Sequence, residues 1–426
     1  MFKSKFLQNN AIVMIGTLLG APLGYAFHFV VSRQISVAQY GELQSLLSLS
    51  IIFGVFNSAL GYFAIRHTSV FSANNDWQAN NDFIGYLQTK TIKFASLVLI
   101  ILLAASPLLA KILHFSSYTG FFVLSLATYI STLTVAYGEV LRGWGNFLTL
   151  TIIALAVGVI KILSGSALAI GFHTTAAVSV SFLVMSIANL YFAKVWTKKM
   201  VAGKPGLQKS ESIWKNKYFP EANIRRTATK IFFFSLAIVL LSNIDVILVK
   251  YFASADIAGF FGAFNMLGKI VLFLNMAVIG VMLPEACVDG HSGRRLNKKN
   301  LLRTYGLMTL IGFGSMTFFY LFPNFVVRLF FGQKYIFETQ LLWLFALISY
   351  LLSVLTLEAN LSFAKRDFRV VYFLIAAILL MVGALAKFRG DLREIILALI
   401  GTLLAGYLAV VSLNIINEKR SKFDKN

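Results

Sequence analysis

Long apolar stretches recur along almost the whole chain and constrain its fold more than any other feature. A helix that crosses the hydrocarbon core of a bilayer needs about 20 mostly apolar residues, and twelve windows of that kind occur here. They cover approximately residues 10–31, 43–64, 92–112, 119–141, 147–171, 174–195, 229–250, 259–283, 304–322, 339–361, 370–386 and 394–416. The alternating pattern of membrane β-strands does not recur. The sequence therefore predicts an all-α polytopic membrane protein with about twelve transmembrane helices.

The composition excludes most soluble classes of protein. Hydrophobic residues make up 58% of the chain and charged residues only 13%, whereas soluble domains carry about 25% charged residues. With Cys287 as the one cysteine, no intrachain disulfide can form. The first window could be read as a signal peptide. Because it runs unbroken from Asn10 to Val31 without a convincing cleavage site, we expect an uncleaved first span.

The basic residues indicate the orientation in the membrane. The chain has a formal net charge of +21 from 38 Lys and Arg residues against 17 acids. With the N-terminus inside, 28 basic residues lie in or beside inside segments, eight lie in or beside outside segments, and Lys161 and Lys269 lie within windows. This positive-inside bias predicts that both termini are cytoplasmic, in the cell membrane. It also accounts for most of the charge, so no nucleic-acid partner is expected.

A polar, basic connection divides the windows six against six. It runs from Trp196 to about Ala228 and contains Pro205 and Pro220. We expect an N-terminal six-helix bundle over residues 1–196, a cytoplasmic linker over 197–228, a C-terminal six-helix bundle over 229–416 and a cytoplasmic tail over 417–426. The connection is read as a solvated linker, with a binding patch for anionic lipid headgroups as the alternative.

The two halves show faint similarity at an offset near half the chain length. Ser36 matches Ser254 and Gly41 matches Gly259 at an offset of 218, and Glu139 matches Glu358 at 219. Each pair has the same position relative to the predicted spans. This pattern favours two bundles related by a pseudo-two-fold axis along the membrane normal, with a substrate site between them near the midplane, as in secondary transporters.

Three segments carry a resemblance to a known family. NIDVILVKYFASADIAGFFGAFNMLGKIVLFLNMAVIGVMLPEA (Asn243 to Ala286) resembles spans 7 and 8 of bacterial polysaccharide flippases of the multidrug/oligosaccharidyl-lipid/polysaccharide exporter superfamily. SRQISVAQYGELQSLLSLS resembles their first connection, and EVLRGWGNFLTL (Glu139 to Leu150) resembles their turn between spans 4 and 5. The resemblance covers nearly the whole chain, and the count of twelve spans agrees with it.

The resemblance implies a flippase that moves polyprenyl-pyrophosphate-linked oligosaccharides to the outer leaflet by alternating access. It implies membrane lipids and the glycan polymerase or ligase machinery as partners, and no cofactor. Relatives that flip the peptidoglycan precursor carry arginines in their first two spans. Here span 1 has only His28, and Arg66 lies just beyond span 2, which argues against that substrate.

Four residues are candidates for a cationic substrate-binding cavity: Lys161, Lys269, His28 and Arg66. An ionisable group near the bilayer centre is costly and usually faces a cavity or a partner. Lys161 and Lys269 lie in the middle of their windows, where two ammonium groups would attract a pyrophosphate or an acidic sugar. The alternatives are snorkelling or pairing with an acid for the lysines, packing for His28, and interfacial anchoring for Arg66.

Four residues are candidates for ion coupling or gating: Asp245, Glu139, Glu358 and Arg142. Asp245 lies within span 7, where it would pair with a cavity lysine, bind a coupling proton or sodium ion, or hold two spans together. Glu139 and Glu358 end spans 4 and 10 on the predicted cytoplasmic side. They are read either as gating partners of Arg142, Lys365 or Arg366, or as plain interfacial carboxylates.

Two other functions remain open. One is an ion-coupled multidrug or cation antiporter of the same superfamily, and the other is a membrane glycosyltransferase or polymerase that uses lipid-linked sugars. The longest outside connection, about residues 323–338, is too short for a catalytic domain. The sequence has no GxxxxGK[ST], HExxH or CxxC motif, so we expect neither an enzyme nor a metal site. The energy source is predicted to be an ion gradient or removal of the product.

Overall fold

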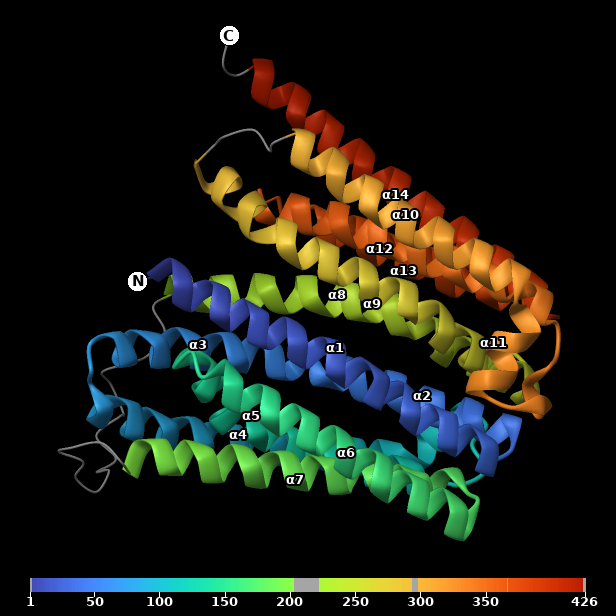
Figure 1. The fold of residues 1–426 in the computed structure, drawn as a ribbon, viewed down its shortest axis with the longest axis horizontal. Coiled ribbons are helices and arrows are strands. Elements are labelled where there is room, and N and C mark those ends of the chain that lie inside the picture. Colours follow the sequence, from blue (N-terminus) through green and yellow to red (C-terminus); the bar gives the residue numbers. More distant parts are fainter. Residues whose placement is uncertain (1, 203–221, 293–297, 366, 424–426) are drawn as a thin grey trace. The chain divides into compact units, whose positions relative to one another are not determined.

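A computed structural model describes residues 2–202, 222–292, 298–365 and 367–423, and within them every regular element is helical (Figure 1). The first seven helices are α1 (Phe2–Gln34), α2 (Val37–Gly54), α3 (Phe56–Ala73), α4 (Trp77–Ile112), α5 (Thr119–Gly143), α6 (Phe147–Phe172) and α7 (Thr175–Ala202). The others are α8 (Ala222–Phe252), α9 (Ala255–Ser292), α10 (Lys298–Leu321), α11 (Pro323–Phe330), α12 (Leu342–Ala364), α13 (Val370–Lys387) and α14 (Leu392–Phe423), with short 3₁₀ turns at Gln333–Tyr335 and Thr339–Leu341.

The helices confirm the predicted multi-pass membrane fold. Each predicted window falls on one helix to within three residues, except that the second covers α2 and α3, which meet at Val55. Among the described residues, ten spans are long and apolar enough to cross a membrane, with α2 and α3 counted together. The pair α10–α11 is an eleventh candidate, bent by 92°. The predicted first window lies in α1, many of whose side chains are outside the described set.

The described chain forms two compact units. Unit 1 holds residues 1–36 and 49–235, and unit 2 holds residues 37–48 and 236–426, so α2 and α8 each contribute to both units. The predicted linker over 197–228 overlaps the end of α7 and the start of α8, and residues 203–221 lie outside the described residues. In the predicted tail, α14 continues to Phe423.

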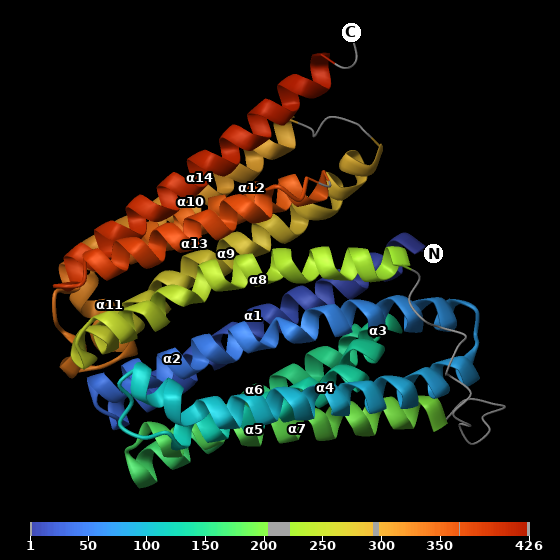
Figure 2. The same ribbon diagram turned by 180° about the vertical axis from the view of Figure 1, so that it is seen from behind.

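Unit 1 is organised around α5. This helix contacts α3, α4 and α7, while α6 contacts α1 and α7, and the course of α4, α5 and α7 can be followed in Figure 2. Short polar residues begin two of these helices: Asp76 accepts a hydrogen bond from the Ala79 amide (2.9 Å), and Asn146 accepts one from the Thr149 amide (3.3 Å). Such side chains satisfy amide groups left free in a first turn, and they fix where α4 and α6 start.

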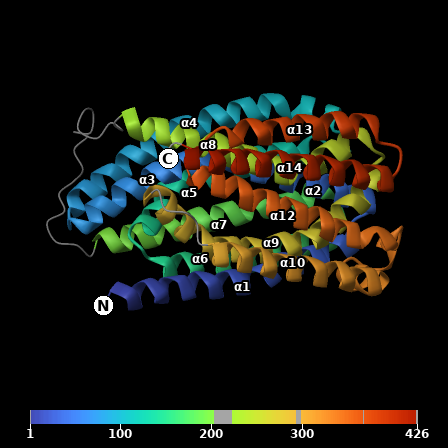
Figure 3. The same cartoon turned by 90° about the horizontal axis from the view of Figure 1, so that it is seen from above.

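Unit 2 is organised around α12, which is buried along most of its length. It contacts α9, α10 and α14, and α13 runs beside α14 (Figure 3). The α9–α12 contact is close because Gly268 has no side chain: a Cβ there would lie 2.6 Å from the Phe345 carbonyl oxygen. Small residues allow such close approach of helix backbones in membranes, and α9 is thereby held against the central helix.

Two glycines from the repeat comparison contact each other within unit 2. A Cβ at Gly41 on α2 would lie 2.8 Å from the Gly259 amide nitrogen on α9, and a Cβ at Gly259 would collide with the Val37 carbonyl oxygen. At the next turn of α9, a Cβ at Gly262 would lie 2.9 Å from the side chain of Gln44. Gly41 and Gly259 are therefore both needed at the same place, where the backbones of α2 and α9 cross too closely for a side chain.

The helix α11 was not anticipated from the sequence. It begins at Pro323, where the missing amide hydrogen costs nothing because a first-turn amide has no helical partner, and it follows α10 at a sharp bend (Figure 1). Val326 and Val327 are buried, while Phe325 and Leu329 are exposed. Its length and its apolar outer side suit a helix that lies along the membrane surface.

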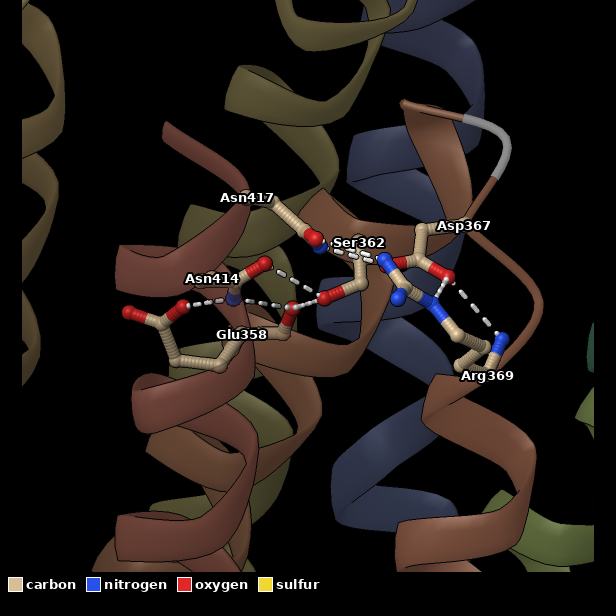
Figure 4. Close-up of polar contacts among 6 residues, drawn as sticks. All are labelled: Glu358, Ser362, Asp367, Arg369, Asn414 and Asn417. Carbon is tan, nitrogen blue, oxygen red and sulfur yellow. Dashed lines mark hydrogen bonds and ion pairs between the residues drawn. The ribbon is translucent and has the colours of Figure 1, made fainter. Parts of the chain in front are cut away.

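Polar contacts join the α12–α13 turn to the last turns of α14 (Figure 4). The Arg369 guanidinium donates to both carboxylate oxygens of Asp367 (2.9 Å each) and to Asn417 Oδ1 (2.5 Å), and Asn417 Nδ2 donates to Asp367 (2.5 Å). These hydrogen bonds, led by those from Arg369, hold the pKa of Asp367 below its ordinary value of 3.8. Asp367 also raises the pKa of Arg369.

This lowered pKa predicts a pH dependence of stability. The Asp367 carboxylate stabilises the fold at pH values above its unfolded pKa, and that contribution is lost as the pH falls through the lower folded pKa, below about pH 4. We expect Asp367→Asn to lower the melting temperature slightly at pH 7. We also expect the melting temperature of this variant to decrease less than that of wild type when the pH is lowered. Thermal melts of both proteins across acid pH test this, and identical pH profiles would contradict it.

Candidate functional site

The first predicted lysine lies among aromatic rings in unit 1. Lys161 on α6 places its Nζ 4.5 Å from the ring centroid of Phe27 on α1 and 5.6 Å from that of Phe182 on α7. Together with His28, these residues form what we call the Lys161 site. Within the described part of the chain, no carboxylate pairs with Lys161. Its ammonium group lies over the faces of the two aromatic rings. This cation–π attraction is stronger where water is excluded.

A glycine makes this arrangement possible. Gly165 lies one turn after Lys161 on the same face of α6, and a Cβ there would collide with the Phe27 ring. Residues four apart on a helix lie on one face, so the ring that fills the space over Gly165 also lies under the Lys161 ammonium group. Phe27 is fully buried, and its ring centroid lies 6.2 Å from that of Phe182.

The predicted histidine belongs to the same site. His28 is 5% exposed and interacts electrostatically with Lys161. Its ring stands edge-on to that of Phe27, with centroids 5.2 Å apart. The structure therefore brings two of the four predicted cavity residues together, on α1 and α6 of unit 1.

The second predicted lysine lies in a cluster of amides in unit 2. Lys269 Nζ on α9 donates to Asn243 Oδ1 on α8 (3.0 Å), and Asn265 Nδ2 on α9 donates to Asp245 Oδ2 on α8 (2.9 Å). We call Asn243, Asp245, Asn265 and Lys269 the Lys269 site. Here the predicted cavity lysine and the predicted coupling acid lie together, on facing helices.

The charges of the Lys269 site are close but not paired directly. Asp245 and Lys269 interact electrostatically without an ion pair at 4 Å or less, because each binds an asparagine instead. Asp245 is 6% exposed, and its Oδ1 has no hydrogen-bond partner in the described structure. An unmade hydrogen bond to a buried charged group is costly, and uptake of a coupling proton or cation by Asp245 remains a prediction.

The carboxylate and arginine predicted as a gate in the first half form an ion pair. Arg142 on α5 contacts both oxygens of Glu139, one turn earlier, at 2.9 and 3.3 Å. The remaining predicted cavity residue, Arg66, is exposed on α3 and lies in neither lysine site. Whether Arg142 and Glu139 act in gating remains a prediction.

The equivalent carboxylate in the second half has other partners. Glu358 on α12 accepts hydrogen bonds from the Tyr305 hydroxyl on α10 and from Asn414 Nδ2 on α14 (2.5 Å for the latter). It forms no pair with Lys365, and Arg366 lies outside the described residues. The two repeat-related acids thus differ: one binds a cation and the other binds neutral groups.

Sequence reasoning missed the uncharged members of both sites. Phe27, Phe182, Asn243 and Asn265 were not among the candidates, although each touches a predicted lysine or aspartate. Spacing offered one signal, since Asn265 lies one turn before Lys269 and Asn243 lies two residues before Asp245. The aromatic partners carried no comparable signal, because phenylalanines occur throughout the spans. In the described part of the chain, no group of three His, Cys, Asp or Glu side chains could hold a metal ion.

Comparisons with known proteins identify the fold. No protein-family model matches the chain, and no curated protein matches it. Several solved structures do. One described as the inward-facing conformation of a multidrug resistance MATE family transporter of the MOP superfamily is 14% identical, with a TM-score of 0.70 over 95% of each chain.

Two further solved structures agree with this. The MATE multidrug transporter DinF-BH in complex with rhodamine 6G is 15% identical, with a TM-score of 0.64 over 99% of this chain and 96% of that chain. The third is a MOP superfamily transporter from Pyrococcus furiosus, described as having a binding pocket of reverse polarity that suggests a different function. It is 15% identical, with a TM-score of 0.63 over 98% of this chain and 97% of that chain. The chain has the fold of the MATE transporters of the MOP superfamily, the superfamily to which the sequence resemblance pointed.

Proposed function

We propose that this chain is a secondary transporter that moves an amphipathic solute across the cell membrane by alternating access. The observation that carries this proposal is the match of the fold to MATE transporters over 95% of both chains. Two helical units, and ten or eleven candidate spans within the described residues, agree with it. We place both termini in the cytoplasm on the positive-inside bias, and we assign the chain no enzymatic activity.

The comparisons favour multidrug export as the first candidate function. Two of the solved structures with this fold are described as multidrug transporters, and one of them holds rhodamine 6G. In this reading an ion gradient drives export, and Asp245 is the group that takes up the coupling ion. Its buried position and its unpartnered oxygen support that role.

The charge of the two lysine sites favours a second candidate, the flipping of polyprenyl-pyrophosphate-linked oligosaccharides. Among the described residues, the neighbours of the Lys161 ammonium group are aromatic rings and His28, and Lys269 donates to a neutral amide and interacts with Asp245 without forming an ion pair. Ammonium groups without a bound carboxylate attract a pyrophosphate and repel a cationic drug. The predicted single cavity shared by both lysines remains part of this proposal.

A binding measurement separates the two candidates. Purified protein in nanodiscs is titrated with rhodamine 6G and, separately, with a fluorescent polyprenyl-pyrophosphate oligosaccharide. Multidrug export predicts binding of the cationic dye, which Lys161→Ala and Lys269→Ala leave intact or strengthen. Flipping predicts binding of the pyrophosphate lipid, which both substitutions weaken by about tenfold, the equivalent of about 1.4 kcal/mol. If folded protein binds neither probe, both substrate assignments are wrong.

A further inference from the structure

The short helix α11 meets α10 at a right angle, and this angle sets its direction in the membrane. α10 has 24 residues and is therefore about 36 Å long, enough to cross the hydrocarbon core of a bilayer. The two helices are bent by 92° between Leu321 and Pro323 (Figure 1). If α10 crosses the bilayer, α11 runs along the membrane surface, on the side that the sequence predicts to be outside.

The inner side of α11 is fixed to unit 2 by apolar packing. Val326 and Val327 are buried, and so are the rings of Phe331 and Tyr335 in the turn that follows the helix. These two rings and the buried ring of Tyr40 on α2 contact one another, with centroids 5.4, 5.5 and 5.7 Å apart. The helix therefore has a fixed orientation within unit 2, with one side buried and the other exposed.

The outer side of α11 is apolar and carries an arginine. Phe325 is 61% exposed and Leu329, one turn later, is 46% exposed, and the exposed Arg328 lies beside Leu329. The exposed ring of Phe322, before the helix, lies 5.6 Å from that of Phe318 on α10 (centroid to centroid), so the apolar surface continues onto α10. We call this surface the α11 face, formed by Phe318, Phe322, Phe325, Arg328 and Leu329.

A second basic residue follows the α11 face closely along the chain. The Gly332 amide donates to the Arg328 carbonyl oxygen (3.1 Å), and the Tyr335 amide donates to the Gly332 carbonyl oxygen (3.3 Å), so Arg328 and the exposed Lys334 lie in consecutive turns. The sequence between α10 and α12 contains one acid, Glu338. In the described structure Glu338 forms no ion pair with either base. This end of unit 2 therefore presents an apolar surface with positive charge beside it.

We propose that the α11 face binds an anionic phospholipid of the outer leaflet. A helix that lies in the membrane surface inserts its apolar side chains at the boundary between headgroups and acyl chains, so Phe325 and Leu329 would contact the acyl chains. The Arg328 guanidinium has planar N–H donors that match a phosphate group, and the Lys334 ammonium group adds attraction for the same headgroup. This binding site does not depend on the identity of the transported solute.

Quenching by brominated lipids tests the proposal. Cys287 is the one cysteine of the chain, so a bimane label can be attached at Phe325→Cys in full-length protein that carries Cys287→Ser. The labelled protein is placed in bilayers of phosphatidylcholine and phosphatidylglycerol in which one or the other lipid is brominated, at equal mole fractions. We expect both lipids to quench the label, with a preference of about fivefold or more for phosphatidylglycerol, because each basic residue near an anionic surface contributes about that factor.

Substitution of the two bases tests the role of the charge. In the same labelled protein, Arg328→Gln combined with Lys334→Gln should abolish the preference for phosphatidylglycerol while quenching by both lipids persists. The matched control is Lys387→Gln. Lys387 is also an exposed lysine in a connection predicted to be outside, and its Nζ lies 5.3 Å from the ring centroid of Phe388, as Lys334 Nζ lies 5.9 Å from that of Tyr335. This control should keep the preference of the labelled parent protein.

A second reporter, Leu329→Cys, serves if the Phe325→Cys protein does not fold. Three results would overturn the proposal. Labels that neither lipid quenches would show that another occupant, such as a second copy of the chain, or water covers the α11 face. Equal quenching by the two lipids would show that the site has no preference for an anionic headgroup. A preference that survives the loss of both bases would show that Arg328 and Lys334 do not bind the headgroup.

Discussion

Lys269→Ala is expected to reduce flipping of a pyrophosphate lipid by about tenfold or more, because one hydrogen bond to a charged group contributes about 1.5–3 kcal/mol. The same substitution should destabilise the fold. It leaves the buried Asp245 carboxylate, whose Oδ1 already has no hydrogen-bond partner among the described residues, without the nearby positive charge. We expect a lower melting temperature in nanodiscs, equivalent to about 1–3 kcal/mol, the cost of an unsatisfied buried group.

A double variant separates these two effects. Adding Asp245→Asn to Lys269→Ala removes the uncompensated carboxylate and should restore most of the melting temperature without restoring flipping. Lys194→Ala, which removes an exposed lysine of α7, is the control for loss of one positive charge and should behave like wild type in both measurements. If the double variant flips the lipid as fast as wild type, Lys269 has only a structural role.

Gly259→Ala is expected to be the most damaging small substitution in unit 2. The added Cβ would collide with the Val37 carbonyl oxygen, and a backbone atom cannot move aside as a side chain end can. Overfilling a tightly packed contact usually costs about 1–3 kcal/mol. Gly41→Ala should have a similar effect, because its Cβ would meet the Gly259 amide at 2.8 Å.

A second glycine of α9 supplies the control. A Cβ at Gly280 would meet no described atom within 4 Å, so Gly280→Ala changes the same helix in the same way without a collision. Thermal melts of the variants in nanodiscs should therefore show a lower melting temperature for Gly259→Ala and Gly41→Ala than for Gly280→Ala. Equal melting temperatures for all three would show that the α2–α9 crossing is looser than the structure indicates.

The spans were predictable because a helix that crosses a membrane needs a certain length and an apolar composition, and both can be read from a continuous stretch of sequence. Local breaks were harder. The prediction began the third span at residue 92, whereas α4 begins at Trp77, since Asp76 caps a helix whose first turns include the buried polar Asn80. The break at Val55 and the sharp turn before Pro323 likewise depend on tertiary contacts that an apolar window does not record.

The candidate sites divide in the same way. Isolated charges within apolar windows stand out, so Lys161, Lys269, Asp245 and Glu358 were identified from the sequence. Their uncharged partners were not, because the partner of Lys161 is a phenylalanine from α1 and those of Glu358 come from α10 and α14. Pairing across helices depends on register and on small residues such as Gly165, which spacing along one helix cannot reveal.

Transport in proteoliposomes that contain this chain alone tests the central claim most directly. Vesicles are loaded for two assays: export of rhodamine 6G against an imposed ion gradient, and movement of a fluorescent polyprenyl-pyrophosphate oligosaccharide between leaflets. The account predicts that one of the two solutes moves faster than in protein-free vesicles, and that the solute bound in nanodiscs is the one that moves. Folded protein that moves neither solute above the protein-free rate would contradict the account.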